Sequence, residues 1–152
     1  MPDEMVIRLA TLDDVPEAVR MAAARLAESP FGMLFPPSRP QLERTVSLTL
    51  ERGVGWLVEH RGLAVGMLGA VAGIHPATGQ LYAEEVAWYV EPGYRQYQLG
   101  PRLLERLLDW CRTKNVTMLK MSSPVGSDIG TYLERQGFTA VEVAYVLVMA
   151  PG

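Results

Sequence analysis

The chain has 152 residues, of which 49% are hydrophobic and 20% are charged, and its formal net charge at pH 7 is −3. This size and composition predict one globular domain, which we place at residues 3–150. The acidic balance excludes an overall positive field, so we expect no nucleic acid partner. The longest uncharged apolar run, residues 62–74, is too short to span a membrane, so we expect no membrane partner.

The cysteine and histidine residues, together with the N-terminal sequence, argue against a disulfide-bonded, metal-binding or secreted protein. The one cysteine, Cys111, cannot form a disulfide framework, and its place among helical leucines favours a buried, inert thiol. His60 and His75 have no metal-ligand spacing, so we expect no metal. The N-terminus is acidic and has no apolar signal-peptide region. These observations predict a cytoplasmic protein.

The first half of the chain predicts a strand, two helices and three further strands. Residues 5–10 alternate as a strand does, and Thr11 followed by Asp14 is typical of a helix start, as is Ser38 followed by Gln41. We expect helices at 11–29 and 38–53, separated by an apolar loop bounded by prolines. Strands at 55–60, 63–73 and 81–90 follow without helices between them, which favours antiparallel pairing.

The second half predicts two helices, each followed by a strand. The first helix has a continuous apolar stripe and ends near Asn115; the stripe consists of Leu103, Leu104, Leu107, Leu108 and Cys111. A strand at 116–121, a short helix at 127–137 and a long final strand at 138–149 complete the order β-α-α-β-β-β-α-β-α-β. The fold class is therefore α/β, with a mixed sheet, and the strands at 81–90 and 116–121 are expected to be parallel neighbours.

The junction between the strand at 81–90 and the next helix has the features of an anion site. Pro92 and Gly93 turn the chain, and basic residues outnumber acidic ones from here to Lys114. We expect Pro101 at the first helical position, where the missing N–H costs nothing. The N–H groups of residues 96–100 would then be free to bind phosphate oxygens, with Arg95 or Arg102 adding positive charge.

This junction resembles the acyl-CoA site of the GNAT superfamily of N-acyltransferases. The family signature is Arg/Gln-x-x-Gly-x-Gly/Ala after a strand ending in Val-x-Pro, and Val90, Pro92, Arg95 and Gly100 stand at matching positions. Gln98 replaces the first glycine, a departure that could weaken or reshape phosphate binding. The resemblance extends over residues 5–149 and is most specific between 84 and 138.

The resemblance implies a coenzyme A site between splayed parallel strands. The phosphates would lie against the helix start, and the main chain of the strand at 81–90 would bond the pantetheine amides as an added strand does. The cofactor-binding residues expected from the resemblance are Trp88, Tyr89, Val90, Arg95, Gln96, Tyr97, Gln98, Leu99, Gly100 and Arg102. A backbone N–H of this strand, that of Val90, would hold the oxyanion.

Two glutamates and a tyrosine are the candidate catalytic residues, each with an ordinary structural role as the alternative. By strand alternation Glu85 shares a face with Ala83, Ala87 and Tyr89, whose small members leave room for substrate, so it is the preferred base over Glu84. A bulge would exchange these faces. In the family a tyrosine acid stands where this chain has Leu133, and Tyr132 is one position away.

The expected activity is transfer of an acetyl group from acetyl-CoA to a primary amine by direct attack in a ternary complex. Freeing a lysine-like amine of its proton at pH 7 costs about 4 to 5 kcal/mol, against about 1 kcal/mol for an α-amino group. The alternatives are an acyl-CoA-binding sensor or assembly module without turnover, and a pure interaction domain. The apolar loop at 31–37 could grip the acceptor, pack on the sheet edge or meet a second subunit in a homodimer.

Overall fold

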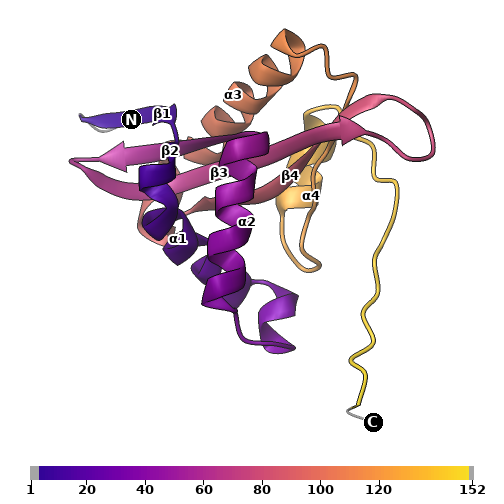
Figure 1. Cartoon of the computed structure of the whole chain (residues 1–152), viewed down its shortest axis with the longest axis horizontal. Coiled ribbons are helices and arrows are strands. Elements are labelled where there is room, and N and C mark those ends of the chain that lie inside the picture. Colours follow the sequence, from indigo (N-terminus) through magenta and orange to yellow (C-terminus); the bar gives the residue numbers. More distant parts are fainter. Residues whose placement is uncertain (1–3, 151–152) are drawn as a thin grey trace.

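The computed structural model describes residues 4–150, so Asp3, at the start of the expected domain, lies outside the described residues (Figure 1). Five strands form one sheet in chain order: β1 (Met5–Leu9), β2 (Val54–His60), β3 (Leu63–Ile74), β4 (Leu81–Val90) and β5 (Met118–Lys120). The first four are antiparallel to their neighbours, and β5 is parallel to β4. The expected mixed α/β sheet is thereby confirmed.

Helices cover both faces of this sheet. The helices are α1 (Val15–Glu28), α2 (Arg39–Arg52), α3 (Leu99–Thr113) and the short α4 (Ile129–Arg135). Strand alternation in β2 separates the faces: Trp56 and Val58 pack in one core cluster with the leucines of α3, whereas Leu57 packs with α1 in another. Figure 1 shows α1 and α2 together on one side of the sheet and α3 on the other. No helix of the described chain has the length and apolar character needed to cross a membrane.

Of the expected helix starts, the one at Ser38 is confirmed, the one at Thr11 opens a 3-10 turn (Leu12–Asp14) directly before α1, and the one at Pro101 is wrong. Thr11 and Asp14 form a capping box, and Ser38 Oγ accepts a hydrogen bond from the Gln41 N–H. Pro101, however, is not the first residue of its helix, because α3 already begins at Leu99. Pro101 still lies in the first turn, where backbone N–H groups have no acceptor within the helix, so the proline costs no helical hydrogen bond.

The expected final strand is absent from the sheet. Residues 138–149 are extended but pair with no strand among the described residues, and the element order ends at α4. The residue pattern predicted β structure because it is rich in valine and aromatic residues. A strand must also lie along an edge of the sheet, and in this chain the segment runs away from the sheet (Figure 1).

The neighbouring strands β4 and β5 separate soon after they meet. Pairing between them is limited to Tyr82 with Met118, Ala83 with Leu119, and Glu84 with Lys120. From Glu85 to Val90, β4 continues with β3 on one edge and no paired strand on the other. This is the splay that the resemblance implied, and it opens next to the start of α3.

Candidate functional site

The register of β4 decides which of its backbone groups face the open edge. The Glu91 N–H donates to Val65 O of β3 at 2.9 Å. Since successive residues of an antiparallel strand direct their backbone groups to opposite edges, those of Val90 and Trp88 point into the splay. The main chain of Tyr89 points toward β3 instead, which differs from the expectation that all three would contact pantetheine. Trp88 and Val90 therefore supply the open groups.

Arg95 braces the turn that follows β4. Its Nε donates to Val90 O at 2.9 Å, and its Nη2 forms an ion pair with both carboxylate oxygens of Glu28 in α1 at 2.7 and 2.8 Å. Its guanidinium also lies over the Tyr89 ring, 5.6 Å from the centroid. The sequence analysis expected Arg95 or Arg102 to add positive charge at the phosphates, and here the charge of Arg95 is directed to Glu28 of α1. Arg102, by contrast, is exposed in the first turn of α3 and has no ion pair among the described residues.

The chain enters α3 through a left-handed residue. Gln98 has φ 59° and ψ 30° and is the residue that precedes the helix. This conformation suits glycine and is strained for a residue with a side chain, which explains the glycine that the family signature has here. Leu99 is fully buried directly after it and fixes the helix start in the core. Gln98 itself is exposed.

Trp88 connects the strand to the helix start and to α4. Its Nε1 donates to Gly100 O at 3.2 Å, and its ring lies 6.2 Å from the ring of Tyr132. A Cβ at Gly100 would lie 3.5 Å from the indole, an ordinary van der Waals contact, so packing against Trp88 does not by itself require a glycine here. Leu133, at the family's tyrosine position, is buried, whereas Tyr132 is half-buried against Trp88. Burial, and then the nearby Glu105, raise the pKa of Tyr132, which keeps its proton.

Glu85 is a buried carboxylate at the point where the two strands separate. Only 2% of its side chain is exposed. Its Oε2 lies 3.4 Å from Arg25 Nη2 of α1, and its Oε1 accepts from the Ser122 N–H at 3.3 Å, just after β5. Burial raises the pKa of Glu85, although Arg25 and the Ser122 hydrogen bond oppose the shift. Sequence reasoning selected Glu85 but not its partners, which are distant in the chain.

A bulge in β4 changes the faces expected around this glutamate. Ala70 pairs with Glu85 and Gly69 pairs with Ala87, so Val86 has no partner opposite it. As a result Ala83 packs in the cluster with α3, while Ala87 and Tyr89 pack in the cluster with α1. The expectation that these residues share one face with Glu85 is therefore wrong. Glu84 is half-exposed and lies 3.4 Å from Lys120 of β5, where it ties the paired halves of the strands.

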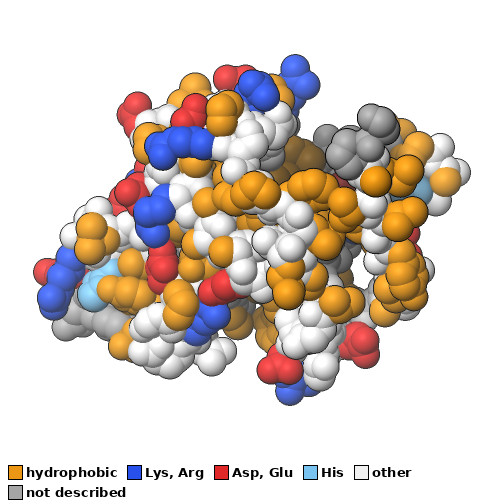
Figure 2. All heavy atoms as spheres, turned by 90° about the horizontal axis from the view of Figure 1, so that it is seen from below, with side chains coloured by type: hydrophobic (Ala, Val, Ile, Leu, Met, Phe, Trp, Pro, Cys, Tyr) orange, Lys and Arg blue, Asp and Glu red, His pale blue; other side chains and the backbone are white. Residues whose placement is uncertain are grey.

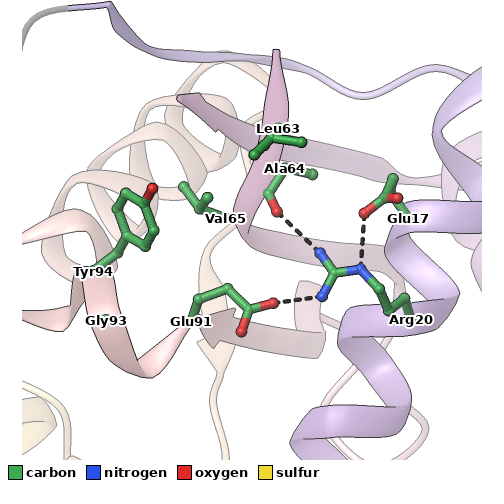
Figure 3. A pocket seen from close by; sticks show the side chains of 8 residues that line it. All are labelled: Glu17, Arg20, Leu63, Ala64, Val65, Glu91, Gly93 and Tyr94. Carbon is green, nitrogen blue, oxygen red and sulfur yellow. Dashed lines mark hydrogen bonds and ion pairs between the residues drawn. The ribbon is translucent and has the colours of Figure 1, made fainter. Parts of the chain in front are cut away.

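Two hollows adjoin β4 and the turn that follows it. An apolar cavity of about 160 Å³ lies between α1, α2 and the sheet, and its lining includes Arg25, Val86 and Ala87. A shallower hollow of about 450 Å³ lies at the far end of β4 (Figure 3). There the guanidinium of Arg20 in α1 donates to Ala64 O and forms an ion pair with Glu91. The two opposite charges in this hollow therefore neutralise each other, and their contacts hold the end of β4 against β3 and α1. Only the first hollow reaches the neighbourhood of Glu85.

The sequence matches the model of the Acetyltransferase (GNAT) family over residues 20–138. The chain belongs to this acetyltransferase family. No protein of curated function matches the sequence. The junction, the splayed strands and Glu85 all lie within the matched residues.

Solved structures share this GNAT fold at low sequence identity. A ribosomal-protein-alanine N-acetyltransferase from Brucella melitensis biovar Abortus 2308 has a TM-score of 0.70 and 20% identity, over 97% of this chain and 99% of its own. A predicted acetyltransferase with acetyl-CoA from Clostridium acetobutylicum has a TM-score of 0.76 and 18% identity, over 95% and 96%. A GCN5-related N-acetyltransferase from Ralstonia eutropha JMP134 has a TM-score of 0.73 and 18% identity, over 95% of this chain and 98% of its own. At these identities the likeness shows the fold.

The residues at the GNAT junction fit the acetyl-CoA that the family uses. The start of α3 offers backbone N–H groups and its dipole to phosphates, and Arg102 supplies an accessible positive charge. The open edge at Trp88 and Val90 offers unpaired backbone groups to the amides of pantetheine. Val90 O is partly satisfied by Arg95, which leaves its N–H as the free donor at this position.

Proposed function

We propose that this protein transfers the acetyl group of acetyl-CoA to a primary amine by direct attack of the amine in a ternary complex. The observation that carries the proposal is the buried Glu85 carboxylate, held by Arg25 and the Ser122 N–H, beside the open edge of β4. A base at this point would face the acceptor amine when the thioester lies along that edge. The family supports acetyl transfer, and the site supports amine chemistry.

Glu85 has the properties that an amine acceptor requires. An ammonium group cannot attack until it loses a proton, and a carboxylate with a raised pKa accepts that proton more readily at neutral pH. As the new C–N bond forms and the C–S bond breaks, the amine proton passes to Glu85, directly or through water. Arg25 and Ser122 keep the carboxylate in one orientation throughout.

Two other groups would stabilise the negative charges that develop on the carbonyl oxygen and on the departing thiolate. The Val90 N–H, on the open edge, would donate to the carbonyl oxygen as negative charge develops on it. Tyr132, packed against Trp88 and still protonated at neutral pH, would donate a proton to the departing thiolate. Acetyl-CoA supplies the activated acetyl group, and no metal enters the proposal.

The cavity beside Arg25 supports an acceptor with an apolar portion. It lies on the α1–α2 side of the sheet and is lined mainly by apolar residues, with Val86 and Ala87 of β4 on its wall. An acceptor that filled it would bring its amine to the bulge next to Glu85. The amine panel used to test the protein should therefore pair α-amino and lysine-like amines with and without apolar substituents.

The test combines binding with turnover. Coenzyme A at about 100 times its dissociation constant is expected to stabilise the protein by about 2.7 kcal/mol in a thermal-shift titration. Acetyl-CoA with a productive amine is expected to release free thiol and yield the acetylated amine by mass spectrometry. No shift with coenzyme A would overturn cofactor binding. A shift without thiol release over the whole panel would favour the acyl-CoA-binding module instead.

The base is tested by adjacent glutamates that serve as a matched pair. Glu85→Gln is expected to lower kcat/KM by about 100-fold or more, because it removes the proton acceptor while keeping the shape of the side chain. Glu84→Gln, which removes only the half-exposed contact with Lys120, is expected to stay within a few-fold of the unmodified protein. Full turnover by Glu85→Gln, with unchanged coenzyme A binding, would show that another group is the base.

A further inference from the structure

The segment Phe138–Met149, here called the C-terminal segment, has the composition of a buried strand and the exposure of a free chain. Its side chains are apolar on both alternating faces apart from Thr139 and Glu142. Yet Val141 is 80% exposed, Tyr145 91% and Leu147 81%. A strand that is apolar on both faces is typical of a sheet interior, covered on each side. Nothing in the described chain provides that cover.

Little connects this segment to its own chain. The Phe138 N–H donates to Leu133 O at 3.0 Å, and Glu142 lies 3.1 Å from Lys120 Nζ. Beyond Glu142, no hydrogen bond or ion pair joins the segment to the rest of residues 4–150. Figure 1 shows it continuing away from the sheet. In the view from below, hydrophobic side chains gather across the middle of the molecule and along its right side (Figure 2).

The strand β5 has one edge that could accept such a segment. It pairs with β4 along one edge, and no described strand pairs with its other edge. An open edge of backbone N–H and C=O groups at the side of a sheet is a template for another strand. The C-terminal segment passes this edge at Lys120 and then leaves it. Between Phe138 and Met149 there is no Gly, Pro, Asn or Asp to turn the chain back.

We propose that residues 143–149 of each chain pair with the free edge of β5 in a second copy of the chain, forming a strand-exchanged dimer. Each copy offers one unpaired segment and one unpaired edge, so a two-fold arrangement satisfies both at once. These residues span about 23 Å when extended. The exchange covers the apolar side chains that the isolated chain leaves exposed.

The exchange also supports the site, although it does not depend on the proposed function. β5 has three residues and one neighbour, and Ser122, which follows it directly, holds the Glu85 carboxylate. A second strand on β5 fixes the position of that N–H. Dimerisation thereby completes the wall of the cleft opposite β4.

The first test measures mass and uses two valines of similar exposure. Light scattering after size-exclusion chromatography is expected to give twice the chain mass for the full-length protein. Val143→Asp is expected to raise the dimer dissociation constant by at least about tenfold, because it places a charge in the exchanged strand. Val125→Asp is the control: Val125 is 72% exposed and Val143 67%, so the isolated chain predicts no difference between them. A monomer at every concentration, or equal behaviour of the two variants, overturns the proposal.

The second test separates exchange from other ways to form a dimer. Isotope-labelled and unlabelled full-length proteins are unfolded, mixed and refolded, and filtered NOE spectra then report contacts between chains only. Contacts between the Tyr145 ring of one chain and β5 of the other are expected. A dimer in which Tyr145 contacts β5 of its own chain only would overturn the exchange. Neither readout involves acetyl-CoA, so failure here is distinct from failure of the acetyl transfer proposal.

Discussion

The second half of β4 and the C-terminal segment both have a backbone edge with no paired strand among the described residues, and they differ in how their side chains are held. In the second half of β4, Trp88 packs toward α3 and Tyr89 packs toward α1, so the strand is fixed on both faces. In the C-terminal segment the equivalent aromatic, Tyr145, is almost fully exposed. An open edge whose side chains are packed in this way can stay accessible to a small ligand without exposing apolar surface. An open edge without such anchors exposes apolar surface and needs another chain to cover it.

Removing an aromatic side chain from each stretch gives the largest expected contrast. Trp88→Ala deletes a core contact, the hydrogen bond to Gly100 O and the support of Tyr132, so we expect a loss of about 3 kcal/mol in the free energy of unfolding. Tyr145→Ala is expected to cost less than about 0.5 kcal/mol in the dilute, monomeric protein. Urea unfolding measures both. Equal losses would mean that the two stretches are anchored alike.

The buried Glu85 beside the open edge of β4 also predicts a pH dependence of activity and of stability. Glu85 is the base only when ionised, so kcat/KM is expected to fall about tenfold per pH unit below its raised pKa. The stability changes in the opposite sense. Because the folded-state pKa exceeds the ordinary value of 4.5, the stabilisation from the protonated form is present below that value and is lost as pH rises through the folded pKa.

Glu85→Gln checks the stability half of this prediction. The variant has no carboxylate to ionise, so its free energy of unfolding is expected to lack the loss between pH 4.5 and neutrality, and to equal or exceed that of the unmodified protein at pH 7. Glu84→Gln leaves the buried carboxylate in place and should retain the loss. A Glu85→Gln protein with the same pH profile of stability as the unmodified chain would show that another group is responsible.

Features set by near neighbours in the sequence could be predicted, and features set by the strand that lies alongside could not. Caps, strand alternation and the turn into α3 depend on neighbours within a few residues, and the Thr11 and Ser38 starts were found on that basis. The limits of β5 and the bulge at Val86 depend on which strand lies alongside, and a single sequence does not state this. The splay came from family resemblance rather than from the residue pattern.

The site shows the same division. Glu85 was preferred over Glu84 because strand alternation placed small residues on its face. The bulge removes that reason, and Arg25 and Ser122, which hold Glu85, approach it only after folding. Arg95 was expected at the phosphates because an arginine before a helix start favours anions, and Glu28, which binds it here, lies on a different helix. The C-terminal segment has a clear strand pattern, but the residue pattern of one chain does not determine which strand edge it will pair with.

The two arginines at the junction are expected to separate stability from ligand binding. Arg95→Gln loses the Val90 O hydrogen bond and the pair with Glu28, and since both charged groups are nearly half exposed the expected loss is about 1 kcal/mol. Arg102→Gln is expected to leave stability within about 0.5 kcal/mol and to weaken coenzyme A binding several-fold. Urea unfolding and a thermal-shift titration measure the two effects. An Arg102→Gln protein that binds coenzyme A normally would remove this residue from the phosphate site.

The smallest expected effect concerns the left-handed residue that fixes the open edge next to the helix. Gln98→Gly relieves the strain at φ 59° but frees the unfolded chain, so the net gain in stability is expected to be below about 1 kcal/mol. Gln98→Ala is the control, because alanine has the same strain at this φ and should give no gain. Urea unfolding at one protein concentration compares the three. If alanine stabilised the protein as much as glycine, the effect would come from the glutamine side chain and not from its backbone, and the family's preference for glycine here would need a cause in the bound phosphates alone.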